Sequence, residues 1–179
     1  MSEASGASIV VTPLSALDEV ARRVRPRSVV TLMSSADPVP LPPGIEAVRH
    51  MHLAFNDIVA PREGLVPPGE EHVSRIIAHA REWNGQAPLL IHCWFGVSRS
   101  PAAAAIAVAA RRPERSGASI ATALRRAAPF ATPNRLMVEI ADRLLDRGGE
   151  LVAAIDAIGR GAEVSEGLPF TLALDPPEA

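Results

Sequence analysis

The sequence of 179 residues contains no lysine and no tyrosine, so all 18 of its basic residues are arginine. Without lysine, a Schiff-base nucleophile, a pyridoxal phosphate enzyme and a lysine-bearing nucleotide P-loop are excluded. The net charge is −2 and the arginines are scattered, so neither nucleic acid nor an anionic membrane is expected as the main partner. The arginine-only, alanine-rich composition indicates a bacterial gene of high GC content.

Cysteine is also scarce, because Cys93 is the only one in the chain. A single cysteine excludes an internal disulfide and fits a reducing cytoplasm. Residues 1–6 are acidic where an export signal would carry basic residues, so we expect a cytoplasmic protein. The longest apolar run, Pro101 to Ala110, has about half of the roughly 20 residues that cross a bilayer, and we expect a core helix there.

Short apolar, β-branched runs alternate with segments whose apolar residues recur at helical spacing. Strands are predicted at 8–13, 28–33, 49–55 and 88–92, and helices at 15–24, 70–83, 99–111, 117–127, 134–146 and 150–158. This alternation predicts an α/β sandwich with a central, largely parallel sheet of four to five strands flanked by helices. We expect one domain over 1–179, with a core at 8–147 and a C-terminal helix and tail at 148–179.

One stretch, residues 92–101, leaves the buried strand, turns through a glycine and enters the alanine-rich helix. At such a junction the loop amides can point inward and form a phosphate site beside the helix N-terminus. The amides would belong to Trp94, Phe95, Gly96, Val97, Ser98 and Arg99. Because thiols near helix N-termini and cationic groups ionise readily, we expect Cys93 to be a thiolate. Arg99 can offer two donors to a phosphate, and Ser100 can donate to the sulfur.

The order His, Cys, five residues, Arg, Ser resembles the signature of the cysteine-dependent protein tyrosine phosphatase superfamily. The dual-specificity branch and small bacterial phosphatase-like proteins are most similar, over residues 28 to 145. The resemblance implies hydrolysis of phosphomonoesters through a cysteinyl phosphate on Cys93, with Asp57 as general acid after the strand at 49–55. It implies no metal and no cofactor.

Two further residues have supporting roles in this interpretation. Pro133-Asn134 is similar to a pair that opens a late helix in dual-specificity enzymes, and we expect Asn134 to cap that helix. His92 is expected to hydrogen-bond the backbone behind the loop and so to orient Cys93. Trp83, Phe130 and Phe170 are expected to pack in the core.

The amino acids within the loop also indicate the substrate. Rhodaneses have a shorter loop, and low-molecular-weight tyrosine phosphatases and arsenate reductases place theirs near the N-terminus. Lipid phosphatases that act on 3-phosphoinositides typically carry lysine in the loop, whereas this loop has Trp94, Phe95, Val97 and Ser98 at its variable positions. The partner is therefore expected to be a phosphorylated protein or a small aryl phosphate, with phosphate-like anions held in the loop.

Several alternatives remain open at this point. Cys93 could be a buried structural residue, and Glu63 or Asp37 could be the acid in place of Asp57. The same fold and loop could also serve a module that binds phosphate or phosphoprotein without turnover.

A metal-dependent hydrolase is a further alternative. His50 and His52 share one strand face and precede Asp57, so these three residues could be metal ligands. No further cluster with ligand spacing completes such a site.

Overall fold

The computed structural model describes residues 7–47 and 49–175. Residues 1–6, where we looked for an export signal, and the last four residues of the expected tail lie outside it. The elements are β1 (Ser8–Pro13), η1 (Leu14–Ala16), α1 (Leu17–Val24), β2 (Ser28–Met33), β3 (Arg49–Ala54), α2 (Glu70–Glu82), β4 (Leu89–Cys93), α3 (Arg99–Arg111), α4 (Gly117–Ala127), α5 (Arg135–Leu144), α6 (Glu150–Ile158) and β5 (Phe170–Ala173). In these ranges, no helix is both long and apolar enough to cross a membrane.

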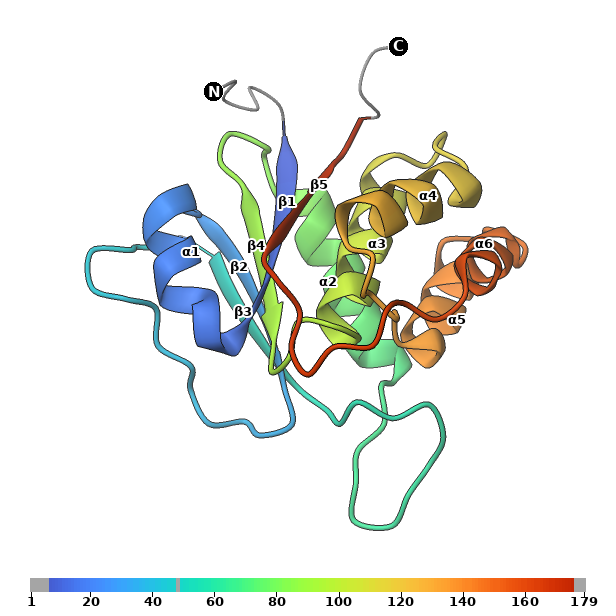
Figure 1. Cartoon of the computed structure of the whole chain (residues 1–179), viewed down its shortest axis with the longest axis horizontal. Coiled ribbons are helices and arrows are strands. Elements are labelled where there is room, and N and C mark those ends of the chain that lie inside the picture. Colours follow the sequence, from blue (N-terminus) through green and yellow to red (C-terminus); the bar gives the residue numbers. More distant parts are fainter. Residues whose placement is uncertain (1–6, 48, 176–179) are drawn as a thin grey trace.

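The five strands form one sheet in the order β3-β2-β4-β1-β5. β1, β2, β3 and β4 are parallel, and β5 pairs antiparallel with β1. The predicted α/β fold with a largely parallel sheet is therefore confirmed. In Figure 1, α1 covers one face of the sheet, and the other helices lie on the opposite face.

The side chains of the central strand β4 are apolar on both of its faces, which explains why helices cover both faces of the sheet. Leu89, Ile91 and Cys93 of β4 belong to the larger core under α2 to α6, whereas Leu90 packs with α1. Side chains of a strand point alternately to opposite faces, so an apolar run such as β4 fits a strand buried on both sides. The helix after β4 is the expected core helix, because every residue from Arg99 to Ala110 in α3 is buried.

The C-terminal part of the chain corrects one expectation. We expected the core to end at residue 147, but β5 pairs with β1 as the fifth strand of the sheet. Phe170 packs in the core as expected. Phe170 and Leu172 are buried in the larger core, as is Leu174 just after the strand. The core therefore extends well beyond residue 147.

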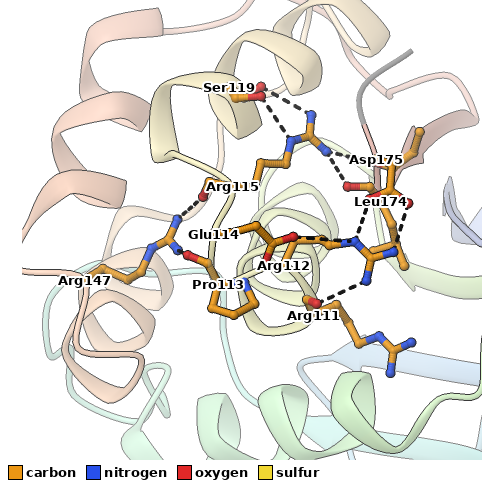
Figure 2. A network of polar contacts seen from close by, with 10 residues as sticks. Arg111, Arg112, Pro113, Glu114, Arg115, Ser119, Arg147, Leu174 and Asp175 are labelled. Carbon is orange, nitrogen blue, oxygen red and sulfur yellow. Dashed lines mark hydrogen bonds and ion pairs between the residues drawn. The ribbon is translucent and has the colours of Figure 1, made fainter. Parts of the chain in front are cut away.

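Arginine side chains hold this last strand in place (Figure 2). Arg115 is buried and donates from Nη1 to the carbonyls of Ala173 and Leu174 at 2.9 and 2.8 Å. Arg112 forms an ion pair with Asp175 at 2.6 Å. A planar guanidinium with five donors can bind two backbone carbonyls at once, which explains how one side chain can hold the chain end here.

Candidate active site

The four parallel strands end at the same edge of the sheet, and the loops that follow them gather there. In open α/β sheets, ligands bind outside the carboxyl ends of the strands. β4 lies at the centre of the sheet and ends at Cys93, and α3 begins at Arg99. We call residues 93–99 the cysteine loop.

Gly96 allows this loop to turn sharply. Its φ is +69°, a left-handed conformation that side chains with a Cβ rarely adopt. A Cβ at this position would lie 2.9 Å from the backbone nitrogen of Pro13, at the end of β1. Two independent constraints therefore require glycine here.

The carbonyl groups of the cysteine loop are bound by neighbouring segments of the chain. Four backbone amides from three segments donate to them: Leu14 to Trp94 (3.1 Å), Gly167 to Phe95 (2.8 Å), Thr132 to Val97 (2.9 Å) and Asn134 to Ser98 (3.2 Å). These four hydrogen bonds hold the backbone of the cysteine loop in its curved conformation. Such a loop can keep its amides in place for an anion, as in other backbone nests that bind phosphate.

The sulfur of Cys93 lies inside this curl and is nearly fully buried. The Gly96 amide donates to Cys93 Sγ at 3.2 Å, and Ser100 Oγ lies 3.0 Å from the same sulfur. The expected contact between Ser100 and the sulfur is therefore present. The Gly96 amide and the Ser100 hydroxyl are thus two polar groups in contact with the sulfur.

Arg99, the last residue of the cysteine loop, is buried with only 5% of its surface exposed. Its Nη1 donates to the carbonyl of Phe55 at 2.8 Å and to Ser34 Oγ at 3.3 Å. Its Nε is buried and has no hydrogen-bond partner among the described residues. A buried donor without a partner costs free energy, so a bound anion that accepts from it is stabilised.

Asp57 is the only one of the three candidate acids with a hydrogen bond to the cysteine loop in the described residues. Ser98 Oγ and Asn134 Nδ2 donate to Asp57 Oδ1 at 2.7 and 2.8 Å. Asp37 instead accepts from Ser35, and Glu63 is exposed farther along the same loop as Asp57. The structure thus brings Asp57 to the loop.

The side chain of Asn134 makes three hydrogen bonds, of which the sequence predicted one. Its Oδ1 accepts from the Met137 amide at 3.1 Å, which confirms the expected helix cap. Its Nδ2 donates to Asp57 Oδ1 and also to the carbonyl of Ile58 at 3.2 Å. The residue that starts α5 therefore also orients the carboxylate that precedes α2.

His92 corrects a second expectation. We predicted a hydrogen bond to the backbone, but His92 Nε2 lies 2.7 Å from Thr31 Oγ1, and its buried Nδ1 has no partner in the described part of the chain. Thr31 faces His92 directly on the neighbouring strand, which explains the contact. Burial lowers the pKa of His92 from 6.5 to about 3, so this histidine is neutral at pH 7.

The two histidines of β3 are not arranged with Asp57 as metal ligands. His50 Nε2 lies 2.7 Å from Thr31 Oγ1, and His52 Nε2 lies 3.0 Å from the carbonyl of Ser35. Within residues 7–47 and 49–175, no three histidine, cysteine or acidic side chains are grouped so as to hold a metal ion.

The aromatic residues of the loop lie at its rim. Trp94 and Phe95 are 52% and 53% exposed and contact each other edge to face. Both aromatic rings are thus accessible to a ligand.

Comparisons with known proteins agree with the fold. No family model matches the sequence, and no curated protein matches it. Among solved structures, human DUSP28 has a TM-score of 0.57 at 20% identity, over 75% of this chain and 86% of that one. A mouse putative dual specificity phosphatase complexed with zinc tungstate has a TM-score of 0.55 at 20% identity, over 87% of this chain and 96% of that one. Tk-PTP in its active form has a TM-score of 0.56 at 21% identity, over 82% and 99%. The chain therefore has the fold of the dual-specificity and tyrosine phosphatases.

Proposed function

We propose that the protein is a cysteine-dependent phosphatase that hydrolyses phosphomonoesters, of the protein tyrosine or dual-specificity type. The proposal rests on the position of Cys93 Sγ. This sulfur accepts a hydrogen bond from the Gly96 amide and lies beside the Ser100 hydroxyl. A structural cysteine does not require two polar neighbours, whereas a nucleophilic thiolate and a thiolate leaving group both do.

In the first step, Cys93 Sγ attacks phosphorus in line with the leaving oxygen. The S–P bond forms as the P–O bond breaks, and the leaving oxygen takes a proton from Asp57. The second carboxylate oxygen, Oδ2, carries that proton, because Oδ1 already accepts from Ser98 and Asn134. The product of this step is a cysteinyl phosphate and a free alcohol or phenol.

In the second step, water attacks phosphorus and gives its proton to the carboxylate of Asp57. The S–P bond breaks, and the hydroxyl of Ser100 stabilises the departing thiolate. Arg99 Nε and the loop amides hold the equatorial oxygens through both steps. The mouse relative was solved with zinc tungstate, and tungstate is a tetrahedral oxyanion like phosphate. That complex supports the expectation of oxyanion binding in this loop.

Hydrolysis of p-nitrophenyl phosphate tests the proposal. We expect turnover by the natural chain, with and without a chelator, and none by Cys93→Ser. The Cys93→Ser variant keeps the amides and Arg99, so it should retain phosphate affinity. Phosphate binding without turnover by the natural chain would instead establish a non-catalytic binding module. Activity that a chelator removes would support the metal site on His50 and His52.

A further inference from the structure

The segment between α6 and β5, residues 159–169, lies directly against the cysteine loop; we call it the C-terminal connector. The Gly167 amide donates to the carbonyl of Phe95 at 2.8 Å. A Cβ at Gly167 would lie 2.5 Å from Cε2 of Phe130 and 2.9 Å from the carbonyl oxygen of Gly96. The connector thus approaches the cysteine loop as closely as a glycine allows.

The connector is also fixed along its length. At its start, Arg125 donates to the carbonyls of Ile158 and Gly159 at 3.3 and 2.7 Å. The Gly161 amide then donates to Thr132 Oγ1 at 3.0 Å, and the Thr132 amide in turn binds the cysteine loop. At the other end the chain enters β5, which Arg115 holds (Figure 2). Its exposed side chains are therefore presented in a defined position.

The exposed large apolar side chains of the described residues all lie in three segments around Cys93. These segments are the loop that follows β3, the cysteine loop and the C-terminal connector. We call these side chains the apolar rim: Val59, Leu65, Val66, Trp94, Phe95, Val164 and Leu168. Hydrogen bonds join both outer segments to the cysteine loop, through Asp57 with Ser98 and through Gly167 with Phe95. Exposed apolar side chains on segments that are joined to one another in this way can form a binding surface.

The charges in the same segments indicate which partner fits the apolar rim. The loop that follows β3 carries Asp57, Glu63 and one arginine, and the C-terminal connector carries Glu163, Glu166 and one arginine. Arg160 of the connector is already paired with Glu163. Apart from Arg99 of the cysteine loop, the two outer segments together hold four acidic residues and two arginines. This acidic surplus disfavours both an anionic lipid surface and acidic side chains beside the phosphate.

We propose that the apolar rim binds an apolar side chain next to the phosphorylated residue of a protein substrate, with Leu168 of the C-terminal connector as its main contact. This inference rests on the proposed function, because it specifies the substrate of that site. Leu168 is the most exposed large apolar side chain in the described chain, at 72%. It directly follows Gly167, which binds the cysteine loop.

Two phosphopeptides that differ only beside the phosphorylated residue test the proposal, one with leucine and one with glutamate at both flanking positions. Their affinities are measured by calorimetry on Cys93→Ser, which binds without turnover. We expect the leucine peptide to bind about tenfold more tightly. Adding Leu168→Ser should reduce this preference severalfold. Adding Ala162→Ser, in an exposed part of the same connector, should leave the preference unchanged.

The binding and activity measurements test the apolar rim and the phosphatase activity separately. Equal affinities for the two peptides, or a preference that Leu168→Ser leaves intact, would overturn the inference even if the natural chain hydrolyses p-nitrophenyl phosphate. A leucine preference in a chain that hydrolyses nothing would uphold the rim and overturn the phosphatase. Tight binding to anionic phospholipid vesicles, with no binding of either peptide, would replace the protein substrate with a membrane surface.

Discussion

Asn134 Nδ2 donates to Asp57 Oδ1 at 2.8 Å, so the cap of α5 also holds the proposed general acid. Asn134→Ser keeps an oxygen that can accept from the Met137 amide but removes the amide donor to Asp57. We therefore expect this variant to hydrolyse an alkyl phosphate about tenfold more slowly, with stability changed by less than about 0.5 kcal/mol. Asn134→Ala removes both contacts and should also cost about 1 kcal/mol of stability.

Hydrolysis rates on an alkyl phosphate and on p-nitrophenyl phosphate, together with thermal denaturation of both variants, check this prediction. If Asn134→Ser unfolds as easily as Asn134→Ala, the amide contact is structural. If both variants keep full activity on the alkyl phosphate, the orientation of Asp57 does not depend on Asn134.

Asp57→Ala should affect substrates according to their leaving groups. General acid catalysis contributes about 10²–10⁴-fold, and a nitrophenolate leaving group needs little of it. We expect a large loss on an alkyl phosphate and a small loss on p-nitrophenyl phosphate. Glu63→Gln and Asp37→Asn are matched controls and should change neither rate. Equal losses on both substrates for Asp57→Ala would assign the acid to another residue.

Stability should fall as the pH is lowered, because buried histidines must be neutral in the folded chain. Burial lowers the pKa of His79 from 6.5 to about 4, and its Nε2 lies 2.7 Å from Ser28 Oγ. The unfolded chain binds this proton more readily, so the contribution is complete above pH 6.5 and is lost as the pH falls toward 4. His79→Gln can keep the contact with Ser28 and cannot titrate.

Unfolding free energies of the natural chain and His79→Gln, measured between pH 7 and pH 4.5, check this. Carboxylates titrate in both proteins and cancel in the difference. The difference should change by up to about 1.4 kcal/mol per pH unit below pH 6.5. Parallel curves would show that folding does not change the pKa of His79.

The parts of the structure that could be predicted from the sequence depend on local patterns. The cysteine loop follows from an apolar strand, a glycine and an alanine-rich helix within ten residues, and the parallel sheet follows from the alternation of strands and helices. β5 also has a local pattern, because Phe170, Leu172 and Leu174 are buried and the residues between them are exposed. Its alternation was detectable, but the strand has only four residues and follows a long irregular segment.

Other parts depend on contacts between distant residues. Asn134 and Asp57 are 77 positions apart, and no local pattern places them together. His92 meets Thr31 because β2 and β4 pair in a register that puts these two residues opposite each other, which periodicity does not specify. The sequence predicts a tail at the C-terminal connector because the contacts of this segment are made mainly by backbone groups. Every sequence has these groups, so they leave no pattern of side chains.

Trp94 should report anion binding by its fluorescence. Its ring is exposed at the rim of the cysteine loop, while Trp83 is buried and donates to the carbonyl of Ala87, just before the opposite end of β4. Titration with phosphate, sulfate or vanadate should therefore change the emission through Trp94 alone. Trp94→Phe should remove most of the change, and Trp83→Phe should keep it.

Catalysis should fall by no more than about tenfold in Trp94→Phe, because in the proposed site backbone amides and Arg99 hold the phosphate and the indole does not. Emission that stays constant on titration, in a chain that hydrolyses p-nitrophenyl phosphate, would place the indole away from the bound anion. The same result would remove Trp94 from the apolar rim as a contact of the substrate and leave Phe95 and Leu168, which are joined through Gly167, as its centre.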